Sequence, residues 1–277
     1  MGYEVTHNEK LAPDTKLLDI RAPAVAKHIK SGQFVILRVD EKGERIPVTP
    51  IGWDSKEGTI SVVIKEIGVT TRKLCALQVG EEVRDLVGPL GNPGEVKLFG
   101  KVCVIGGGVG IPVAYERAKV LKEAGNEVTA IIGARSADLL VYEEQVRKVV
   151  DHFELVTDDG SKGKKAFVTD ALRNLLESGE KYDLVYAAGP GIMLKTVSET
   201  TRPYNVRTIV SLNSLMIDGT GMCGGCRVTV GGETKFTCVH GPEFDAHLVD
   251  FKEWLSRLNT YLTEERQGTN EYERVRV

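Results

Sequence analysis

The chain contains 277 residues, of which 42% are apolar, and its 36 Lys and Arg residues against 39 Asp and Glu residues give a net charge of −3. The apolar fraction excludes global disorder, and the near balance of charge excludes the basic footprint typical of nucleic-acid-binding proteins. Glycine is unusually frequent at 30 residues, but it follows no repeat and forms no Gly/Ser tract, which excludes collagen-like and linker-like chains. This length predicts about two domains.

No segment of the sequence has the pattern of a secretory signal or a membrane span. The first ten residues, MGYEVTHNEK, lack a basic region followed by an apolar one, and the most apolar stretch, 102–115, is too short and too rich in glycine to cross a bilayer. The five cysteines are an odd number, and three of them fall between residues 223 and 238. We therefore expect a cytoplasmic protein, with neither membrane nor nucleic acid as a partner, whose thiols are reduced or ligate a metal.

Residues 1–98 are expected to form an antiparallel β-barrel. Strand-like segments occur at 32–39 and 59–65, and turn-forming residues lie between them. Short strands separated by turns, without a helical period, are typical of small antiparallel barrels. The segment 87–94, which is rich in Gly and Pro, predicts a loop close to the end of this domain.

Residues 99–208 have a different pattern, which predicts a doubly wound parallel sheet. Apolar strand-like segments alternate with helix-like segments, as in sheets that are covered by helices on both faces. The expected strands are 102–105, 128–133, 153–156 and 184–190, and the expected helices are 114–124, 143–151 and 169–177. The fold class is therefore a β domain followed by an α/β domain.

The C-terminal part divides into a cysteine-rich region, 209–250, and a segment, 251–277, that is expected to form a helix and a tail. Apolar residues from Phe251 to Leu262 recur at intervals of three and four, which predicts an amphipathic helix that packs either on its own domain or on a partner subunit. The last dozen residues are charged and are expected to be loose.

The cysteine-rich region predicts an iron–sulfur site. With Asp218 in the place of the first cysteine, the residues Cys223, Cys226 and Cys238 follow the C-x₄-C-x₂-C…C spacing of plant-type [2Fe–2S] ligation. Four glycines in this loop allow the repeated turns that ligands around two irons require, and let backbone N–H groups approach the sulfurs. They are Gly219, Gly221, Gly224 and Gly225.

Other interpretations of the cysteines remain open. The same residues could form a structural zinc site or a set of reduced, unliganded thiols. Asp218 could be a former of an Asp-Gly turn instead of the fourth ligand, with His240 as a weak competitor for that position. Cys103, in an apolar strand, and Cys75 are expected to be buried structural thiols.

Two loops predict a pyridine-nucleotide site. The segment 106–112 follows a strand and opens a helix, where amide N–H groups and the helix dipole bind phosphate, although a plain strand-to-helix turn has the same appearance. Its G-x-G-x-P form resembles the ferredoxin-NADP reductase-like family, and the segment 188–193 resembles that family's G-P-x-x-M element. The candidate NAD-binding residues are Gly106, Gly108, Gly110, Gly133, Arg135, Gly189 and Pro190.

Two further segments resemble the flavin motifs of the same family. The segment 45–49 is similar to R-x-Y-S/T, with Val48 in place of the stacking tyrosine, and 68–74 is similar to the G-x-x-T-x-x-L helix start that faces the diphosphate. Arg45 alone could equally be an ordinary surface charge. The candidate FAD-binding residues are Arg45, Pro47, Val48, Thr49, Ile64, Gly68, Thr70 and Thr71.

Taken in this order, the motifs resemble the electron-transfer subunit of dihydroorotate dehydrogenase. The segment 211–223, which includes Asp218, is more similar to the small subunit of NADH-dependent reduced ferredoxin:NADP oxidoreductase, also described as sulfide dehydrogenase. This resemblance implies an oxidoreductase with FAD, NAD(H) and one [2Fe–2S] cluster with an Asp ligand. It also implies a heterodimer with a larger iron–sulfur flavoprotein, which bifurcates electrons with ferredoxin and NADP. The alternative from a different functional class is a non-catalytic scaffold subunit whose cysteine loop binds zinc.

The nicotinamide cofactor is ambiguous from the residues. Arg135 and Ser136 follow the second expected strand, where a basic side chain favours the 2′-phosphate of NADP, and no acidic residue is adjacent to hold a ribose hydroxyl. The resemblance implies NAD, which we expect. Because hydride transfer takes place at FAD itself, we assign no catalytic side chain. The sequence determines neither the reduction potentials nor the physiological direction of the reaction.

Overall fold

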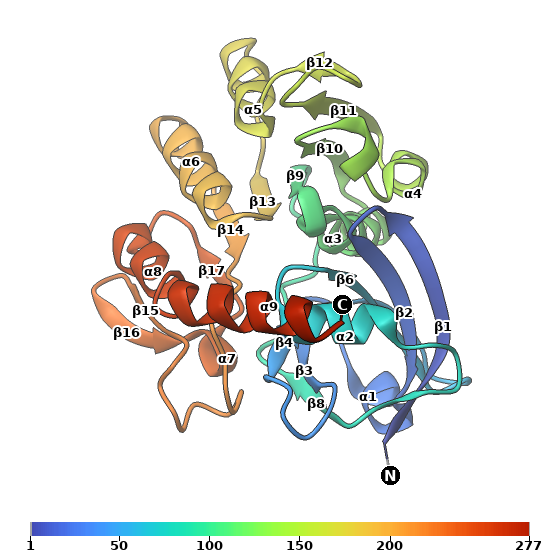
Figure 1. Ribbon diagram of the computed structural model, residues 1–277. Coiled ribbons are helices and arrows are strands. Elements are labelled where there is room, and N and C mark those ends of the chain that lie inside the picture. The colour runs from blue at the N-terminus through green and yellow to red at the C-terminus, as the bar shows by residue number, and fades with distance from the viewer. Residues whose placement is uncertain (1, 277) are drawn as a thin grey trace.

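The computed structural model describes residues 2–276, and its N-terminal part consists of antiparallel strands in two sheets (Figure 1). The larger sheet has the order β5-β6-β2-β1-β7, with β1 (Tyr3–Ala12), β2 (Thr15–Arg21), β5 (Pro50–Asp54), β6 (Thr59–Lys65) and β7 (Glu82–Val83). The smaller sheet has the order β4-β3-β8, with β3 (Phe34–Arg38), β4 (Ile46–Val48) and β8 (Asp85–Leu90). The expected strand 59–65 is confirmed, whereas the described strands do not join into one closed barrel.

One apolar core connects these two sheets. Alternate residues of the strands, including Leu18, Ile20, Val35 and Leu37, are buried in it. The helices α1 (Pro23–His28) and α2 (Val69–Ala76) also contribute to it, and Leu74 of α2 is fully buried there. This packing fixes α2 beside β6, so that the first residues of α2 face the middle of the molecule.

The following segment forms a seven-stranded sheet with the order β12-β11-β10-β9-β13-β14-β17, in which all neighbours are parallel except β14 and β17. Its strands are β9 (Lys101–Gly107), β10 (Glu127–Ala134), β11 (His152–Thr157), β12 (Lys164–Lys165), β13 (Leu184–Ala188), β14 (Thr208–Ser211) and β17 (Glu243–Asp245). Its helices are α3 (Ile111–Glu123), α4 (Glu143–Val149), α5 (Val168–Glu177) and α6 (Gly191–Thr201). The expected alternation of strands and helices is confirmed.

Helices cover both faces of this sheet (Figure 1). On one face, Val102 and Val104 of β9 pack with residues of α3. On the other face, Cys103 and Ile105 pack with residues of α5 and α6. Because both faces are buried, β9 is apolar at successive positions and not at alternate ones.

The C-terminal region is connected to this sheet through β17. It contains a hairpin of β15 (Arg227–Val230) and β16 (Glu233–Phe236), followed by the short helix α7 (Thr237–His240). The expected amphipathic helix is α8 (Phe251–Leu258), and the buried Trp254 donates from Nε1 to Ser214 Oγ at 2.9 Å. α8 therefore packs on its own chain, as one of the two alternatives predicted.

The expectation of a loose C-terminal tail is wrong, because a second helix, α9 (Leu262–Arg276), follows α8. Figure 1 shows α9 crossing in front of α2 and β4. Most residues of α9 are polar or charged, and they leave no apolar stripe along one face. The sequence of this segment therefore lacks the apolar periodicity that indicates a helix.

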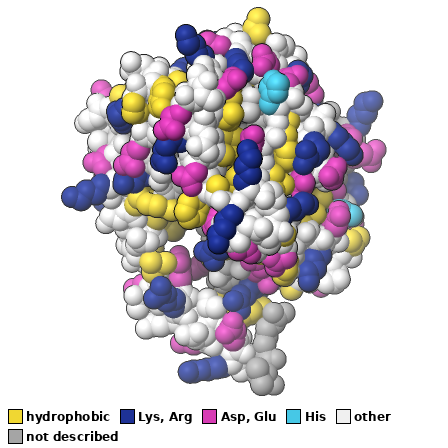
Figure 2. Space-filling view, turned by 90° about the horizontal axis from the view of Figure 1, so that it is seen from above, with side chains coloured by type: hydrophobic (Ala, Val, Ile, Leu, Met, Phe, Trp, Pro, Cys, Tyr) yellow, Lys and Arg dark blue, Asp and Glu magenta, His cyan; other side chains and the backbone are white. Residues whose placement is uncertain are grey.

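On the face seen in Figure 2, basic and acidic side chains are interspersed. Among the described helices, none combines the length and the apolar character that a bilayer span requires.

Candidate flavin, nucleotide and iron–sulfur sites

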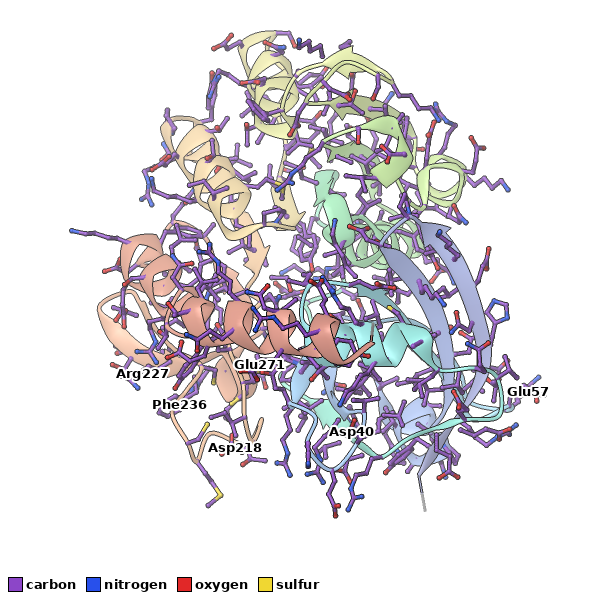
Figure 3. All side chains as sticks on the ribbon, viewed as in Figure 1. Asp40, Glu57, Asp218, Arg227, Phe236 and Glu271 are labelled. Carbon is purple, nitrogen blue, oxygen red and sulfur yellow. The ribbon has the colours of Figure 1, made fainter. Side chains whose placement is uncertain are left out.

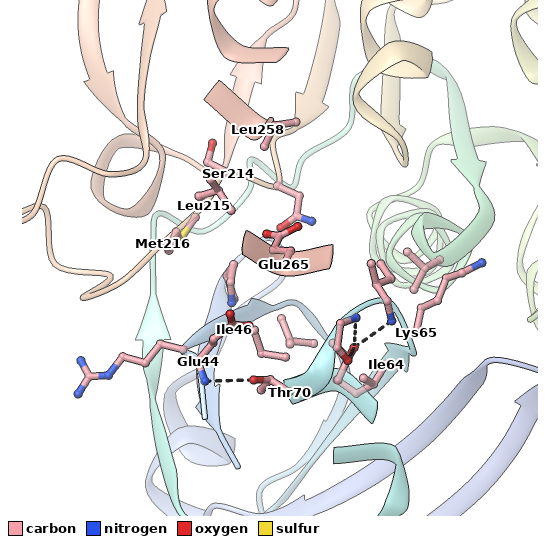
Figure 4. Close-up of a pocket in the computed structure, with 18 of the residues that line it drawn as sticks. Glu44, Ile46, Ile64, Lys65, Thr70, Ser214, Leu215, Met216, Leu258 and Glu265 are labelled. Atoms are coloured by element: carbon pink, nitrogen blue, oxygen red, sulfur yellow. Dashed lines mark hydrogen bonds between the residues drawn. The ribbon is translucent and has the colours of Figure 1, made fainter. Parts of the chain in front are cut away.

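A cavity of about 1360 Å³ lies between the N-terminal sheets, the parallel sheet and the C-terminal region (Figure 4). Its wall includes all eight candidate FAD-binding residues: Arg45, Pro47, Val48, Thr49, Ile64, Gly68, Thr70 and Thr71. It also includes Gly110 and Gly189 from the expected nucleotide loops, and Gly225, which precedes Cys226 in the cysteine loop. The structure thus brings residues from all three predicted sites to one space.

The N-terminus of α2 is shaped by two threonines. Thr71 Oγ1 accepts hydrogen bonds from the backbone N–H groups of Ile67 and Gly68 at 2.9 and 3.0 Å, which caps the helix. Thr70 is buried, and its Oγ1 accepts from the backbone N–H of Glu44 at 3.0 Å (Figure 4). Both hydroxyls therefore hold the loop in place at the N-terminus of α2, whose first residues line the cavity.

These residues are suited to bind a dinucleotide, which has a negatively charged diphosphate in its middle. Arg45 lines the cavity and makes no ion pair or hydrogen bond with any of residues 2–276, so its guanidinium can pair with a phosphate. The α2 amides add hydrogen-bond donors and the positive end of a helix dipole. Val48 and Ile64 supply apolar surface, while Phe34 and Tyr261 are the aromatic side chains among the described lining residues.

The glycines of the expected nucleotide loop have different roles. A Cβ on Gly110 would overlap the backbone of Ala188 and Gly189, so this glycine lets the two loops meet. A Cβ on Gly106 would lie 2.8 Å from Ile111 Cα, and one on Gly133 would lie 2.6 Å from Val168 Cγ1, so both positions allow helix and sheet to pack closely. Gly106, Gly108, Gly133, Arg135 and Pro190 do not line the cavity.

Acidic residues lie near Arg135, which sequence reasoning had missed. Ser136 Oγ donates to Asp138 Oδ1 at 2.5 Å, and the backbone N–H of Asp159 donates to the backbone oxygen of Arg135 at 3.1 Å. Asp159 follows the next strand of the sheet, β11, so its proximity depends on strand order and not on sequence spacing. The turn after β10 thus has carboxylates as well as a guanidinium.

The predicted iron ligands lie in one lobe, where Figure 3 labels Asp218. The sulfurs of Cys226 and Cys238, both buried, are 3.2 Å apart. Cys223 is exposed, and its backbone N–H donates to Asp218 Oδ2 at 2.8 Å. The four residues therefore meet as two pairs. Within residues 2–276, no group of three or more His, Cys, Asp and Glu side chains converges as a metal site.

Asp218 is held as a carboxylate by its own loop. Its oxygens accept hydrogen bonds from the backbone N–H groups of Thr220, Met222 and Cys223 at 3.0, 2.9 and 2.8 Å. Burial acts to raise its pKa, but hydrogen bonds from the Thr220 and Cys223 amides outweigh burial and lower it. Three thiols and a carboxylate suit an iron–sulfur cluster chemically, and positive φ at Gly221 and Gly224 allows the loop to turn between them.

The other candidates for this site are engaged elsewhere. His240 Nδ1 accepts from the backbone N–H of Phe236 at 2.9 Å, outside the ligand pairs. Cys75 and Cys103 are fully buried, as expected of structural thiols, and burial raises the pKa of Cys75 to about 12.

Arg257 is a further residue of the site that no sequence signal indicated. It lies on α8, lines the cavity and donates from Nη2 to the backbone oxygen of Gly225 at 3.0 Å. An arginine on the polar side of an amphipathic helix resembles any surface charge, so only the fold reveals this position.

Comparisons with models of known protein families identify the class of protein to which two segments of the chain belong. Residues 3–93 match the family described as oxidoreductase FAD-binding domain, and residues 213–250 match the iron–sulfur cluster binding domain of dihydroorotate dehydrogenase B. The chain therefore has a ferredoxin reductase-like FAD-binding fold with mixed sheets and an iron–sulfur binding domain.

The relatives then show the family. The chain is 46% identical, over 95% of its length and 93% of the relative's, to a dihydroorotate dehydrogenase B (NAD(+)) electron transfer subunit homolog of Thermotoga maritima. It is 35% identical over 78% of its length, and 79% of the relative's, to a probable subunit of the same description in Methanocaldococcus jannaschii. A solved structure of an NADH-dependent reduced ferredoxin-NADP oxidoreductase is similar with a TM-score of 0.93 and 43% identity, over 100% of this chain and 99% of that one. The chain belongs to the family of dihydroorotate dehydrogenase B electron-transfer subunits and their homologues, which are oxidoreductases.

Proposed function

We propose that this chain is an electron-transfer subunit that moves electrons between NAD(H), FAD and a [2Fe–2S] cluster. It would act in the cytoplasm as part of a heterodimer with a larger iron–sulfur flavoprotein, in a complex that couples NADH, ferredoxin and NADP by flavin-based electron bifurcation. The observation that carries the proposal is the single cavity lined by Arg45, Gly110 and Gly225, one residue from each predicted site. The relative with a solved structure supports the bifurcating complex.

The residues of the cavity have separate tasks in this proposal. Bound FAD supplies the conversion between two-electron hydride chemistry at a nicotinamide and one-electron chemistry at a cluster. Arg45 and the amides of α2 would hold the diphosphate, and Val48 and Ile64 would keep water from the ring. Gly110 and Gly189 would let the nicotinamide approach, and Arg257 would fix the cysteine loop at the cavity wall.

The proposed ligands of the cluster are Asp218, Cys223, Cys226 and Cys238. The proposed domains are a flavin domain at 1–98, a doubly wound nucleotide domain at 99–208, a cluster region at 209–250 and a C-terminal segment at 251–277. The remaining proposed contacts of the nucleotide are Gly106, Gly108, Gly133, Arg135 and Pro190. Asp138, three residues after Arg135, and Asp159, whose backbone contacts that of Arg135, support NAD, because carboxylates in this turn would repel a 2′-phosphate.

Anaerobic titration of the isolated subunit with NADH and with NADPH tests this proposal. We expect flavin absorption, iron without zinc, and bleaching by NADH accompanied by the EPR signal of a reduced cluster. Bleaching by NADPH alone would overturn the choice of NAD. A protein that contains zinc and no iron, or that lacks flavin, would contradict the whole proposal. The remaining interpretation would be a scaffold protein without activity.

A second candidate is the electron-transfer subunit of dihydroorotate dehydrogenase. The match over residues 213–250 and the description of the Thermotoga maritima relative favour it. Co-purification distinguishes the two candidates. A large iron–sulfur flavoprotein as the partner indicates the bifurcating complex, and a barrel-type orotate enzyme indicates the second candidate.

A further inference from the structure

Helix α9 forms the outer wall of the cavity. Its residues 264–266 and 268–270 line the space, and Glu265 lies across it from Glu44 and Ile46 (Figure 4). Most of its side chains are exposed, whereas Gly268 and Thr269, which face the cavity, are half-buried. The helix thus lies over an open space along much of its length.

Contacts to α2 hold α9 in this position on the protein side. Arg72 of α2 pairs with Glu273 at 2.5 Å, and Lys73 Nζ lies 6.0 Å from the centre of the Tyr272 ring. Exposed pairs of this kind contribute little stability, and a short polar helix is marginal by itself in water. Because α2 is the helix whose first amides face the expected diphosphate, these contacts place α9 beside the polar half of a bound FAD.

Gly268 is the residue of α9 that protein packing does not explain. Glycine inside a helix is unfavourable relative to alanine, yet a Cβ at this position would meet no atom of the described chain within 4 Å. The helix has no positive φ there that would require glycine. Gly268 lines the cavity, and the position that its Cβ would occupy is open space. A flat backbone surface at this point suits a ligand that lies against it.

The polar groups around Gly268 indicate which part of the ligand lies there. Asn270 lines the cavity, and its amide makes no hydrogen bond with any of residues 2–276. Burial, and then repulsion by Glu44 and Glu264, raise the pKa of Glu265, which shows that carboxylates gather at this edge. Carboxylates and an amide suit the hydroxyl and amino donors of an adenosine better than another phosphate.

We propose that α9 is a binding element for the adenosine half of FAD, with the backbone at Gly268 as its contact surface and Asn270 as a polar contact. The inference rests on the proposed function, because it requires FAD in this cavity.

Titration of the full-length apoprotein with FAD and with FMN, followed by flavin fluorescence, tests the inference. We expect Gly268→Ala to raise the melting temperature of the apoprotein, because alanine favours the helix, and yet to weaken FAD binding about tenfold through overlap with the ligand. Asn270→Ala should weaken FAD binding about fivefold. FMN binding should be unchanged in both variants. Gln267→Ala, on the exposed face of the same helix, should change neither affinity.

The possible failures are distinct. If wild-type apoprotein binds no FAD, the proposed function is wrong. If it binds FAD, and Gly268→Ala and Asn270→Ala bind it equally well, the proposed function stands and the role of α9 is wrong. Equal weakening of FAD and FMN binding would also overturn the assignment to the adenosine half.

Discussion

Arg257 donates from Nη2 to the backbone oxygen of Gly225 at 3.0 Å and thereby joins α8 to the cysteine loop. Both residues line the cavity, and Gly225 directly precedes Cys226. The Nε of Arg257 is buried and has no partner among the described residues. This arginine therefore lies between the proposed flavin and the proposed cluster.

Replacing Arg257 by Met should disturb the junction of flavin and cluster. The substitution keeps the aliphatic stem but removes the charged donor, so the free energy of unfolding should fall by about 2 kcal/mol. Stopped-flow reduction by NADH should show slower cluster bleaching with unchanged flavin content. The matched control is Arg202→Met, because Arg202 Nη2 also donates to a backbone oxygen, that of His247 at 2.9 Å, outside the cavity. Equal rates in the two variants would contradict a role for Arg257 at this junction.

The proposed fourth iron ligand can be tested by substitution of Asp218. Asp218→Ala should lower iron retention at least about tenfold, since loss of even an outer-shell partner costs that much at metal sites. Asp218→Cys should retain iron and change the EPR spectrum, because a thiolate replaces the carboxylate. Cys103→Ala removes a buried thiol outside the loop and should keep the iron. Full iron content with an unchanged spectrum in Asp218→Ala would leave this residue as a turn former only.

A buried carboxyl between the three parts of the chain should make stability depend on pH. Burial raises the pKa of Glu116 from 4.5 to about 7, partly offset by the hydrogen bond from Ser31 and by Arg117. In the unfolded chain this group ionises near its ordinary pKa, so the folded state retains the proton over a range where the unfolded state has lost it. The free energy of unfolding should therefore fall as pH rises from 4.5 to about 7, by about 3 kcal/mol, and then level off.

Urea unfolding at pH 5 and pH 8 measures this dependence. Glu116→Gln should reduce the difference between the two pH values, because the amide does not titrate. Glu123→Gln, at an exposed position of the same helix α3, should keep the wild-type difference. An identical pH dependence in both variants would show that the proton is held elsewhere.

Substitution of Gly110 should be costly because backbone, not a flexible side chain, occupies the space beside it. A Cβ there would overlap the carbonyl of Ala188, so Gly110→Ala should lower the free energy of unfolding by about 2–3 kcal/mol and weaken NADH binding. Gly52→Ala is the control, since its Cβ would meet Ser61 at an ordinary 3.6 Å. Calorimetry and NADH titration of both variants provide the comparison.

The elements that could be predicted from sequence are those with a local signal. The strand 59–65 is bounded by turn residues, and the apolar segments from Val102 onward follow the pattern of buried strands, so their positions were recovered. Helix α9 has no apolar stripe, and the hairpin of β15 and β16 lies inside the cysteine region, so both were missed.

The candidate site shows the same distinction. Motifs with fixed spacing identified Arg45, Gly110 and the cysteines, and the fold brings residues of each motif to one cavity. Arg257 and Asp159 reach the sites only through tertiary structure, since each lies far along the chain from the residue that it contacts. No pattern within one segment can encode such a contact.

Strand β17 pairs with β14 through Ile209, Val210 and Ser211 and so completes the edge of the parallel sheet. The cysteine region is therefore not a separate domain joined by a linker, because one of its strands belongs to the sheet. Excising residues 212–250, which follow β14, would leave β14 with a row of unpaired backbone groups, which is a template for aggregation. Exchange of this region between related proteins would have to carry β17 and its register along with the cysteines, so the cysteine loop and the parallel sheet are constrained to diverge together.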